Sequence, residues 1–275
     1  MSGLNSLDKV LSILDLFTED RLEWTPEQMR RELGFARPTL YRYLKALREA
    51  GLLTSLPGAG FTLGPRVVEM DFLMRKSDAL VLRGQARLEA LTALEPCAAL
   101  LVRWYGQRLL CVAAECSAPD PLSSYPRGRP MPLARGAISR SIMAFLPRRQ
   151  MTAMIEQNLD ELRGIGLGAD VEEIAERLRA VRRRGHAVAH GEVTPGVVGI
   201  AAPVFDAART PIASLCMTIA GNRITGDRIE TLGREIRARA DEISAALGRD
   251  RASGESGGCP NDPATGRHLL QPEDT

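Results

Sequence analysis

Apolar residues recur at helical spacing along the first part of the chain, and they predict two helices in its first 33 positions. Between Ser6 and Phe17 the apolar side chains stand three or four residues apart, which is typical of a helix that turns one face to a core. The stretch TPEQ at positions 25–28 has the form of a capping box with proline at the first helical position. Gly34 is then the expected end of this second helix.

The stretch from Gly34 to Gly51 predicts a third helix, with Pro38 as its first residue. Leucines at positions 40, 44 and 47 form one apolar stripe, which we expect to face a core. The other faces carry no acid before Glu49, and their bases are Arg37, Arg42, Lys45 and Arg48. A basic amphipathic helix after a tight glycine-containing turn is typical of a helix-turn-helix recognition helix. The alternative is a solvated helix in an ordinary bundle.

A small hairpin is expected directly after the third helix. Short apolar runs at 52–54 and 61–63 flank the turn sequence PGAG, which is typical of two strands joined by a loop. Three helices followed by a hairpin make a winged helix-turn-helix, which we expect for residues 1–64. Helical patterns continue over 66–74 and 78–94, so residues 65–94 are expected to form a linker and a dimerisation surface.

The pattern changes to short strands from residue 98 onward, which indicates a second, α+β domain over residues 95–247. A Pro- and Gly-rich loop is expected at 119–132, and residues 248–275 have the polar composition of a disordered tail. The predicted strands span 98–105, 108–115, 186–190, 198–205 and 212–219. The predicted helices span 136–145, 171–184 and 227–247.

The amino-acid composition indicates the cellular compartment of the protein more clearly than its function. A formal charge of +2 over 275 residues does not by itself indicate a nucleic-acid binder, so the argument rests on the local bases of the third helix. Five cysteines without a CxxC pair favour reduced thiols in a cytoplasmic protein. Charges interrupt the apolar N-terminal stretch, and no apolar run approaches the roughly 20 residues that span a bilayer. We therefore expect no signal peptide and no membrane partner.

DNA contacts are expected from the N-terminal half and outer face of the third helix. Residues at the N-terminal end of a recognition helix usually reach base edges, while those one or two turns on can contact phosphates or bases. Tyr43 could either join them or pack against the first helix. The wing at 55–60 carries no basic residue, so an arginine in the minor groove is not expected there. The candidate DNA-binding residues are Arg37, Pro38, Thr39, Tyr41, Arg42 and Lys45.

Four stretches together resemble the IclR-type transcriptional regulators. They are RPTLYRYLKALREAGLL, FTLGPRVVEM, GRPMPLARGAISRSIMAFLP and RRRGHAVAHGEVTPGVVGIAAPVFD, and the resemblance covers about residues 4–247. It implies a winged-helix domain followed by an effector domain similar to the GAF fold, with a curved antiparallel sheet flanked by helices. It also implies homodimers, in some members paired into tetramers, that bind operator DNA of catabolic genes and respond to a small organic acid.

The effector pocket is expected at the start of the predicted helix 136–145. Free N–H groups at a helix N-terminus suit a carboxylate, and Gly136 allows close approach, so Arg135, Gly136 and Ala137 are candidates. An ordinary loop-to-helix turn is the alternative. The alternation of Cys216 and Thr218 places both on one strand face. The resemblance implies that this face lines the pocket together with Ala189 and Gly199.

Two of these positions depart from the family pattern. Ala189 and Gly199 stand where relatives often carry polar side chains, so we expect a less polar and larger pocket than usual. Such a pocket favours a carboxylate of five or more carbons over acetate, pyruvate or glyoxylate.

Two other functions remain open at this point. One is a thiol-based redox sensor using Cys111 and Cys116, and the other is an enzyme using Cys216 with His190 as base. No nucleophile elbow, paired-carboxylate pattern or P-loop supports an enzyme, so we expect no catalytic residues and no cofactor. His186 and His190 share a strand face, but four residues span about 13 Å, which is too far to chelate one metal ion.

Overall fold

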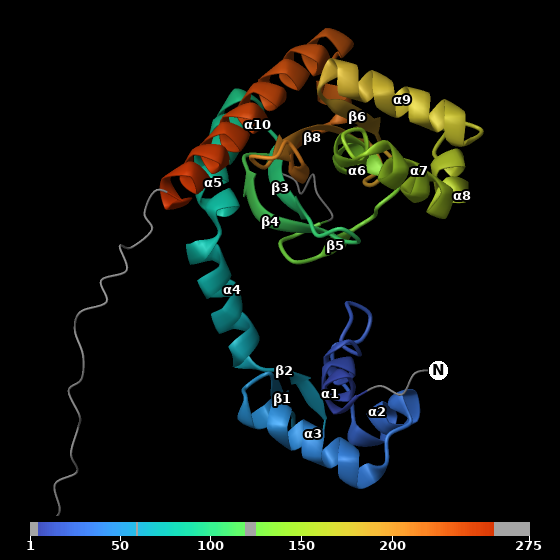
Figure 1. Ribbon diagram of the computed structural model, residues 1–275, viewed down its shortest axis with the longest axis vertical. Coiled ribbons are helices and arrows are strands. Elements are labelled where there is room, and N and C mark those ends of the chain that lie inside the picture. Colours follow the sequence, from blue (N-terminus) through green and yellow to red (C-terminus); the bar gives the residue numbers. More distant parts are fainter. Residues whose placement is uncertain (1–4, 59, 119–124, 256–275) are drawn as a thin grey trace, which may run out of the picture. The chain divides into compact units, whose positions relative to one another are not determined.

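The computed structural model describes residues 5–58, 60–118 and 125–255, which fall into two compact units (Figure 1). The division lies between Asp78 and Ala79. The stretch 65–94 is therefore not one linker, because its first helix belongs to the N-terminal unit and its second to the C-terminal unit. No helix in the described residues is long and apolar enough to cross a membrane.

The N-terminal unit is a winged helix-turn-helix followed by one further helix. Its two strands pair antiparallel, with Leu53 opposite Leu63, and the predicted first strand begins one residue later than expected. The first helix ends at Leu14 rather than Phe17. The elements are α1 (Ser6–Leu14), α2 (Pro26–Leu33), α3 (Arg37–Glu49), β1 (Leu53–Ser55), β2 (Phe61–Leu63) and α4 (Pro65–Ser77).

Local sequence signals account for the helix boundaries of this unit. The Thr25 hydroxyl accepts the N–H of Gln28, whose side chain accepts the N–H of Thr25 in return, so α2 begins with a complete capping box. Gly34 ends the same helix in the left-handed region at φ +68°, a conformation that favours glycine. The turn between α2 and α3 is thereby fixed, and α3 packs on the core of the unit through buried leucines.

The C-terminal unit is an α+β domain built on one antiparallel sheet of six strands, in the order β5-β4-β3-β8-β7-β6. Its strands are β3 (Ala98–Trp104), β4 (Leu109–Cys116), β5 (Pro130–Met131), β6 (Ala187–His190), β7 (Val197–Phe205) and β8 (Pro211–Ala220). Its α-helices are α5 (Ala79–Leu94), α6 (Gly136–Met143), α7 (Arg148–Gln157), α8 (Leu159–Gly164), α9 (Val171–Arg184) and α10 (Gly226–Glu255), and a 3₁₀ turn spans Gly221–Arg223.

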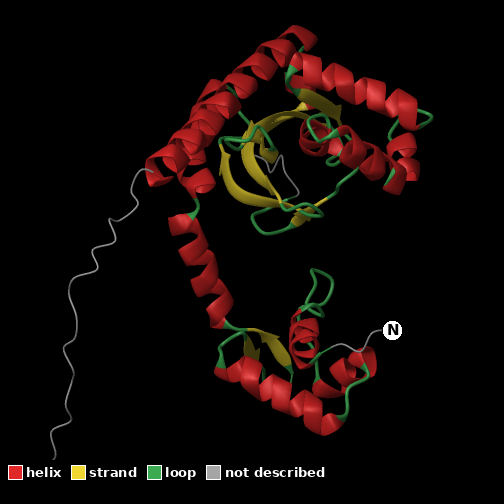
Figure 2. Ribbon diagram, viewed as in Figure 1, coloured by secondary structure: helices red, strands yellow, loops and turns green. Residues whose placement is uncertain are grey.

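The sheet curves between two layers of helices (Figure 2). Alternate residues of each strand point to opposite faces, so Leu100 and Cys216 join the core under α6 and α9, while Leu101 and Leu215 join the core under α5 and α10. Each face is apolar because both are covered. This arrangement places the N-terminus of α6 against the middle of the sheet.

Four features of this unit differ from the sequence-based expectations. Helices α7 and α8 were not predicted, although the stretch 148–164 carries apolar residues at helical spacing, at positions 151, 154, 155, 159 and 162. The expected loop 119–132 contains strand β5, which pairs with the start of β4, while residues 119–124 lie outside the described residues. The helix predicted to end at Leu247 continues to Glu255, because an interior glycine such as Gly248 costs a helix only about 1 kcal/mol. The rest of the expected tail, 256–275, lies outside the described residues.

Candidate DNA-binding helix and effector pocket

Helix α3 presents one buried and one exposed face. Leu40, Leu44 and Leu47 are buried, as the leucine stripe predicted. Tyr43 is also buried, and its hydroxyl lies 3.1 Å from the Ser6 hydroxyl of α1, so this tyrosine packs against the first helix. That contact fixes how α3 rests on α1 and resolves the ambiguity about Tyr43.

Five of the six candidate DNA-binding side chains are exposed, and the sixth, Thr39, is half-buried. The Arg37 guanidinium lies over the Tyr41 ring at 5.6 Å, which pre-orders this pair at the N-terminal end of the helix. Lys45 Nζ lies 3.8 Å from the exposed Glu49 carboxylate. Screening makes such a surface pair weak, so Lys45 remains available to a phosphate. The exposed residues are Arg37, Pro38, Tyr41, Arg42 and Lys45.

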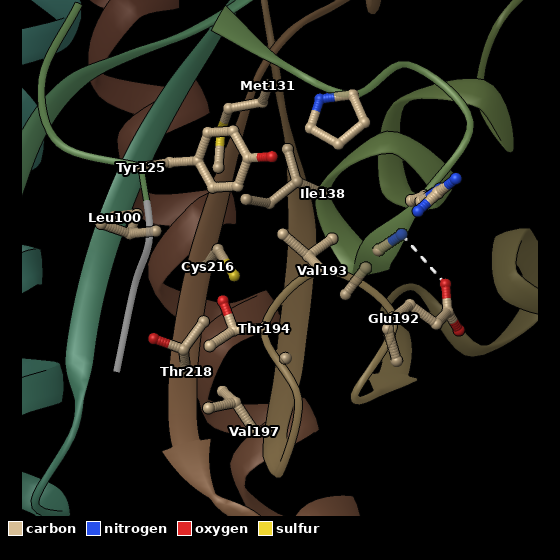
Figure 3. Close-up of a pocket in the computed structure, with 16 residues that line it drawn as sticks. Leu100, Tyr125, Met131, Ile138, Glu192, Val193, Thr194, Val197, Cys216 and Thr218 are labelled. Carbon is tan, nitrogen blue, oxygen red and sulfur yellow. Dashed lines mark hydrogen bonds between the residues drawn. The ribbon is translucent and has the colours of Figure 1, made fainter. Parts of the chain in front are cut away.

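A pocket in the C-terminal unit opens between the N-terminus of α6, the sheet and two loops (Figure 3). All seven candidate effector residues line it, so elements far apart in the sequence converge on one pocket. Leu100, Met131, Ile138, Val193 and Val197 make most of the remaining wall apolar. The seven are Arg135, Gly136, Ala137, Ala189, Gly199, Cys216 and Thr218.

The N-terminus of α6 is already in contact with a carboxylate of the chain itself. The N–H of Gly136 donates to Glu192 Oε2 at 3.0 Å, which Figure 3 draws as a dashed line. Gly136 has a φ of +85°, and a Cβ there would lie 2.8 Å from Val193 Cγ2. The expectation that this first N–H is free was therefore wrong. Within the described residues, no side chain caps the next two N–H groups, those of Ala137 and Ile138.

Glu192 is held from its other oxygen by Arg140, one turn further along α6. Both side chains are largely buried, with exposed fractions of 14% and 11%, and Arg140 Nε also donates to the Gly136 carbonyl at 3.4 Å. The loop 191–196 is thus tied to the start of α6. Arg135 pairs instead with Glu161 at the pocket margin, where both are more exposed.

The polar side chains on the sheet face are largely engaged. Thr218 Oγ1 donates to the Ala98 carbonyl at 3.1 Å, and the Cys216 thiol donates to the Met217 carbonyl at 3.7 Å. A Cβ at Gly199 would lie 3.6 Å from the Ala137 Cβ, so glycine keeps the space beside the helix end open.

The cavity at this site is small. Its volume is about 50 Å³, whereas an engineered apolar cavity that binds benzene measures about 150 Å³. The small side chains at positions 189 and 199 have therefore not enlarged the pocket as expected. Leu100, Ile138 and Val193 project into the space instead (Figure 3). An aromatic acid could enter only if a lining side chain such as Tyr125 or Val193 moved outward.

Two candidate cysteines, Cys111 and Cys216, lack the environment that a reactive thiol needs. Burial raises the pKa of Cys111 to about 11 and also raises the pKa of Cys216. Cys111 and Cys116 lie on the same strand about 16 Å apart, at ~3.3 Å per residue, which is far beyond disulfide reach. His190 is not among the pocket residues that surround Cys216. Among the described residues, no group of three or more His, Cys, Asp or Glu could hold a metal ion.

The pocket and the residues that contact its lining include functional candidates that the sequence analysis missed. Glu192 and Arg140 stand 52 positions apart, and nothing in either local pattern indicates their pairing. Tyr125 and Val193 belong to irregular segments, where periodicity gives no signal for which side chain points inward.

Known proteins agree with this architecture over both units. The model for the "IclR helix-turn-helix domain" matches residues 6–57, and that for "Bacterial transcriptional regulator IclR C-terminal" matches residues 101–245. The chain is 28% identical to the transcriptional regulator KipR of Bacillus subtilis, over 87% of this chain and 96% of that protein.

Solved structures show the same fold. An IclR transcriptional regulator from Alicyclobacillus acidocaldarius superposes with a TM-score of 0.73 at 22% identity, covering 90% of this chain and all of the other. An IclR homologue from Microbacterium hydrocarbonoxydans, solved with 4-hydroxybenzoate, gives 0.71 at 19% identity with the same coverage. The matched proteins are transcriptional regulators and not enzymes. With both of its units matched, this chain belongs to the IclR family of transcriptional regulators.

Proposed function

We propose that the protein is a ligand-responsive regulator of a catabolic operon whose effector is a small organic acid. The observation that carries this proposal is the buried N-terminus of α6, where Ala137 and Ile138 line an apolar cavity and Arg135, the residue before the helix, supplies no side-chain cap. Uncapped N–H groups and the positive end of the helix dipole favour a carboxylate. The relative solved with 4-hydroxybenzoate supports the same ligand class.

Operator DNA is the proposed partner of α3. The candidate contacts are the exposed side chains of Arg37, Tyr41, Arg42 and Lys45, together with Pro38 and Thr39 at the N-terminal end of the helix. A DNA-binding role also supports the cytoplasm as the place of action. Because the overall charge is only +2, the affinity for DNA depends on this one face, and phosphate contacts make that affinity depend on the salt concentration.

A homodimer, in which two such helices read two half-sites, is the proposed working form. Helix α4 supports it, because none of its residues is buried and Val68, Phe72 and Leu73 expose more than half of their surface. Helix α5 is less suited to this role, since Leu80, Leu88 and Leu91 are already buried against the sheet. A dimer of dimers would need a second contact surface in addition to α4.

The experiment is a binding assay with a ligand screen. Fluorescence anisotropy would measure the affinity of the full chain for the intergenic DNA beside its own coding sequence. A thermal-shift screen would then rank small carboxylates, because a ligand that binds only the native state raises the melting temperature. We expect at least one acid to raise the melting temperature and to change operator affinity. If acids leave both quantities unchanged while the DNA binds, the proposed effector class is wrong.

A further inference from the structure

Glu192 is placed where it affects the charge of any ligand in the pocket. Its carboxylate accepts the first N–H of α6, and Glu192 lines the same cavity as Ala137 and Ile138, whose N–H groups follow in the first turn of the helix. The end of a helix carries only about half an elementary positive charge, and Glu192 brings a full negative one. Glu192 therefore offsets part of the electrostatic attraction between the N-terminus of α6 and a carboxylate ligand.

Arg140 limits this effect because it pairs with the outer oxygen of Glu192. The remaining charged residue of the lining, Arg135, is engaged by Glu161 at the margin. The Glu192 carboxylate thus contacts both Arg140 and the first N–H of α6. A ligand carboxylate bound to the N–H groups of Ala137 and Ile138 would lie next to it. Burial weakens solvent screening at this place, so the two negative charges would repel each other.

We infer that Glu192 sets the charge preference of the effector pocket, by lowering its affinity for an anionic ligand relative to a neutral ligand of the same shape. Arg140 acts in the opposite direction by neutralising Glu192. The inference rests on the proposed function, because it assigns these roles within the proposed effector site. A purely structural role of Glu192, tying loop 191–196 to α6, would instead change the affinities of both kinds of ligand together.

The test compares an acid with its amide on the full chain. Isothermal titration calorimetry with 4-hydroxybenzoate and 4-hydroxybenzamide gives two dissociation constants per protein, and their ratio is the readout. In Glu192→Gln the amide oxygen can still accept the Gly136 N–H while the negative charge is lost. We expect the ratio to move about tenfold in favour of the acid, and a movement below threefold or toward the amide overturns the inference.

Two further variants complete the design. Glu156→Gln removes the same charge from an exposed site on α7 and should leave the ratio as in the wild type. Arg140→Gln leaves the charge of Glu192 uncompensated and should move the ratio toward the amide. If circular dichroism shows that Glu192→Gln is unfolded, the Arg140→Gln ratio decides: an unchanged ratio overturns the inference.

The failures of the two proposals are distinguishable. If the acid binds the wild type but the ratio does not respond to the variants, the inference fails and the proposed function stands. If no acid of the wider screen binds any of the folded proteins, the proposed effector class fails, and the role of Glu192 fails with it.

Discussion

Gly233 of α10 lies directly against the imidazole of His186, so close that a Cβ at position 233 would stand 2.3 Å from Nε2. His186 is buried, and neither of its ring nitrogens has a hydrogen-bond partner within the described residues. The glycine therefore lets the long C-terminal helix approach the start of β6. This contact ties α10 to the edge of the sheet that also bears Ala189 of the pocket.

Gly233→Ala should destabilise the protein by about 1–3 kcal/mol, because the added methyl group forces the ring or the helix to move. The comparison is Gly248→Ala in the same helix, where a Cβ meets nothing within 4 Å. There the better helix propensity of alanine should stabilise by up to about 1 kcal/mol. Urea unfolding of both variants measures the difference, and equal effects of the two substitutions would disprove the contact.

The stability of the protein should fall as the pH is lowered through the range below about 6.5. Burial, Arg184 and Arg237 lower the pKa of His186 from its ordinary value of 6.5, and the Glu230 carboxylate at 3.7 Å opposes them only partly. The unfolded chain then binds a proton at a higher pH than the folded one, so acid favours unfolding. Each unit of pKa difference contributes about 1.4 kcal/mol.

Thermal melts at several pH values measure this effect. His186→Gln should flatten the loss of stability between pH 7 and pH 5, while His190→Gln, the same substitution at an exposed position, should not. A wild-type melting temperature that rises on acidification over this range would contradict the assignment.

Arg42→Ala should weaken operator binding strongly while leaving the fold intact. Arg42 is exposed on α3, away from the buried leucines, and a phosphate or base contact would be worth about 1–3 kcal/mol at each half-site. A symmetric dimer loses the contact twice. Gel-shift titration measures the loss, with Arg177→Ala on α9 as a matched control outside the DNA-binding unit. Affinity within twofold of the wild type would remove Arg42 from the interface.

The dimer should depend on the exposed apolar face of α4. Phe72→Glu places a charge on that face, where a second copy would bury it unpaired. We therefore expect the dimer of this variant to dissociate at a higher protein concentration than the wild-type dimer. Light scattering distinguishes the 30.0 kDa monomer from larger species. The control is Ser77→Glu, which adds the same charge at an exposed polar position of the same helix. A wild-type monomer with full operator affinity at micromolar concentration would exclude the proposed dimer.

Local patterns predicted most of the fold, and they failed where distant segments decide the structure. The capping box at Thr25 and the left-handed Gly34 act within a few residues, so α2 and the turn before α3 were predictable. The pairing of Glu192 with Gly136 depends on a loop that returns 56 positions later, which no periodicity reports. Strand β5 was missed for the same reason, since its two residues form a strand only because β4 is beside them.

The size of the pocket was likewise not predictable from local sequence patterns. Small residues at 189 and 199 suggested extra room, but cavity volume depends on which neighbours fill the space, and here Val193 does. A larger acid can still be favoured if a lining side chain turns outward. Such a movement costs on the order of 1 kcal/mol, whereas burying about 100 Å² of apolar surface gains about 2.5 kcal/mol.

The effector account is tested most directly by the response of operator binding to acids in the wild type and in Ala137→Pro, which lacks the N–H of the second helical position. Anisotropy titrations with operator DNA would compare acetate, pyruvate and glyoxylate with carboxylates of five or more carbons. We expect a larger acid to change operator affinity at a lower concentration than the small ones, and Ala137→Pro to bind the operator normally without responding. A response to pyruvate or glyoxylate alone, or an unaltered response in a folded Ala137→Pro, would contradict the account.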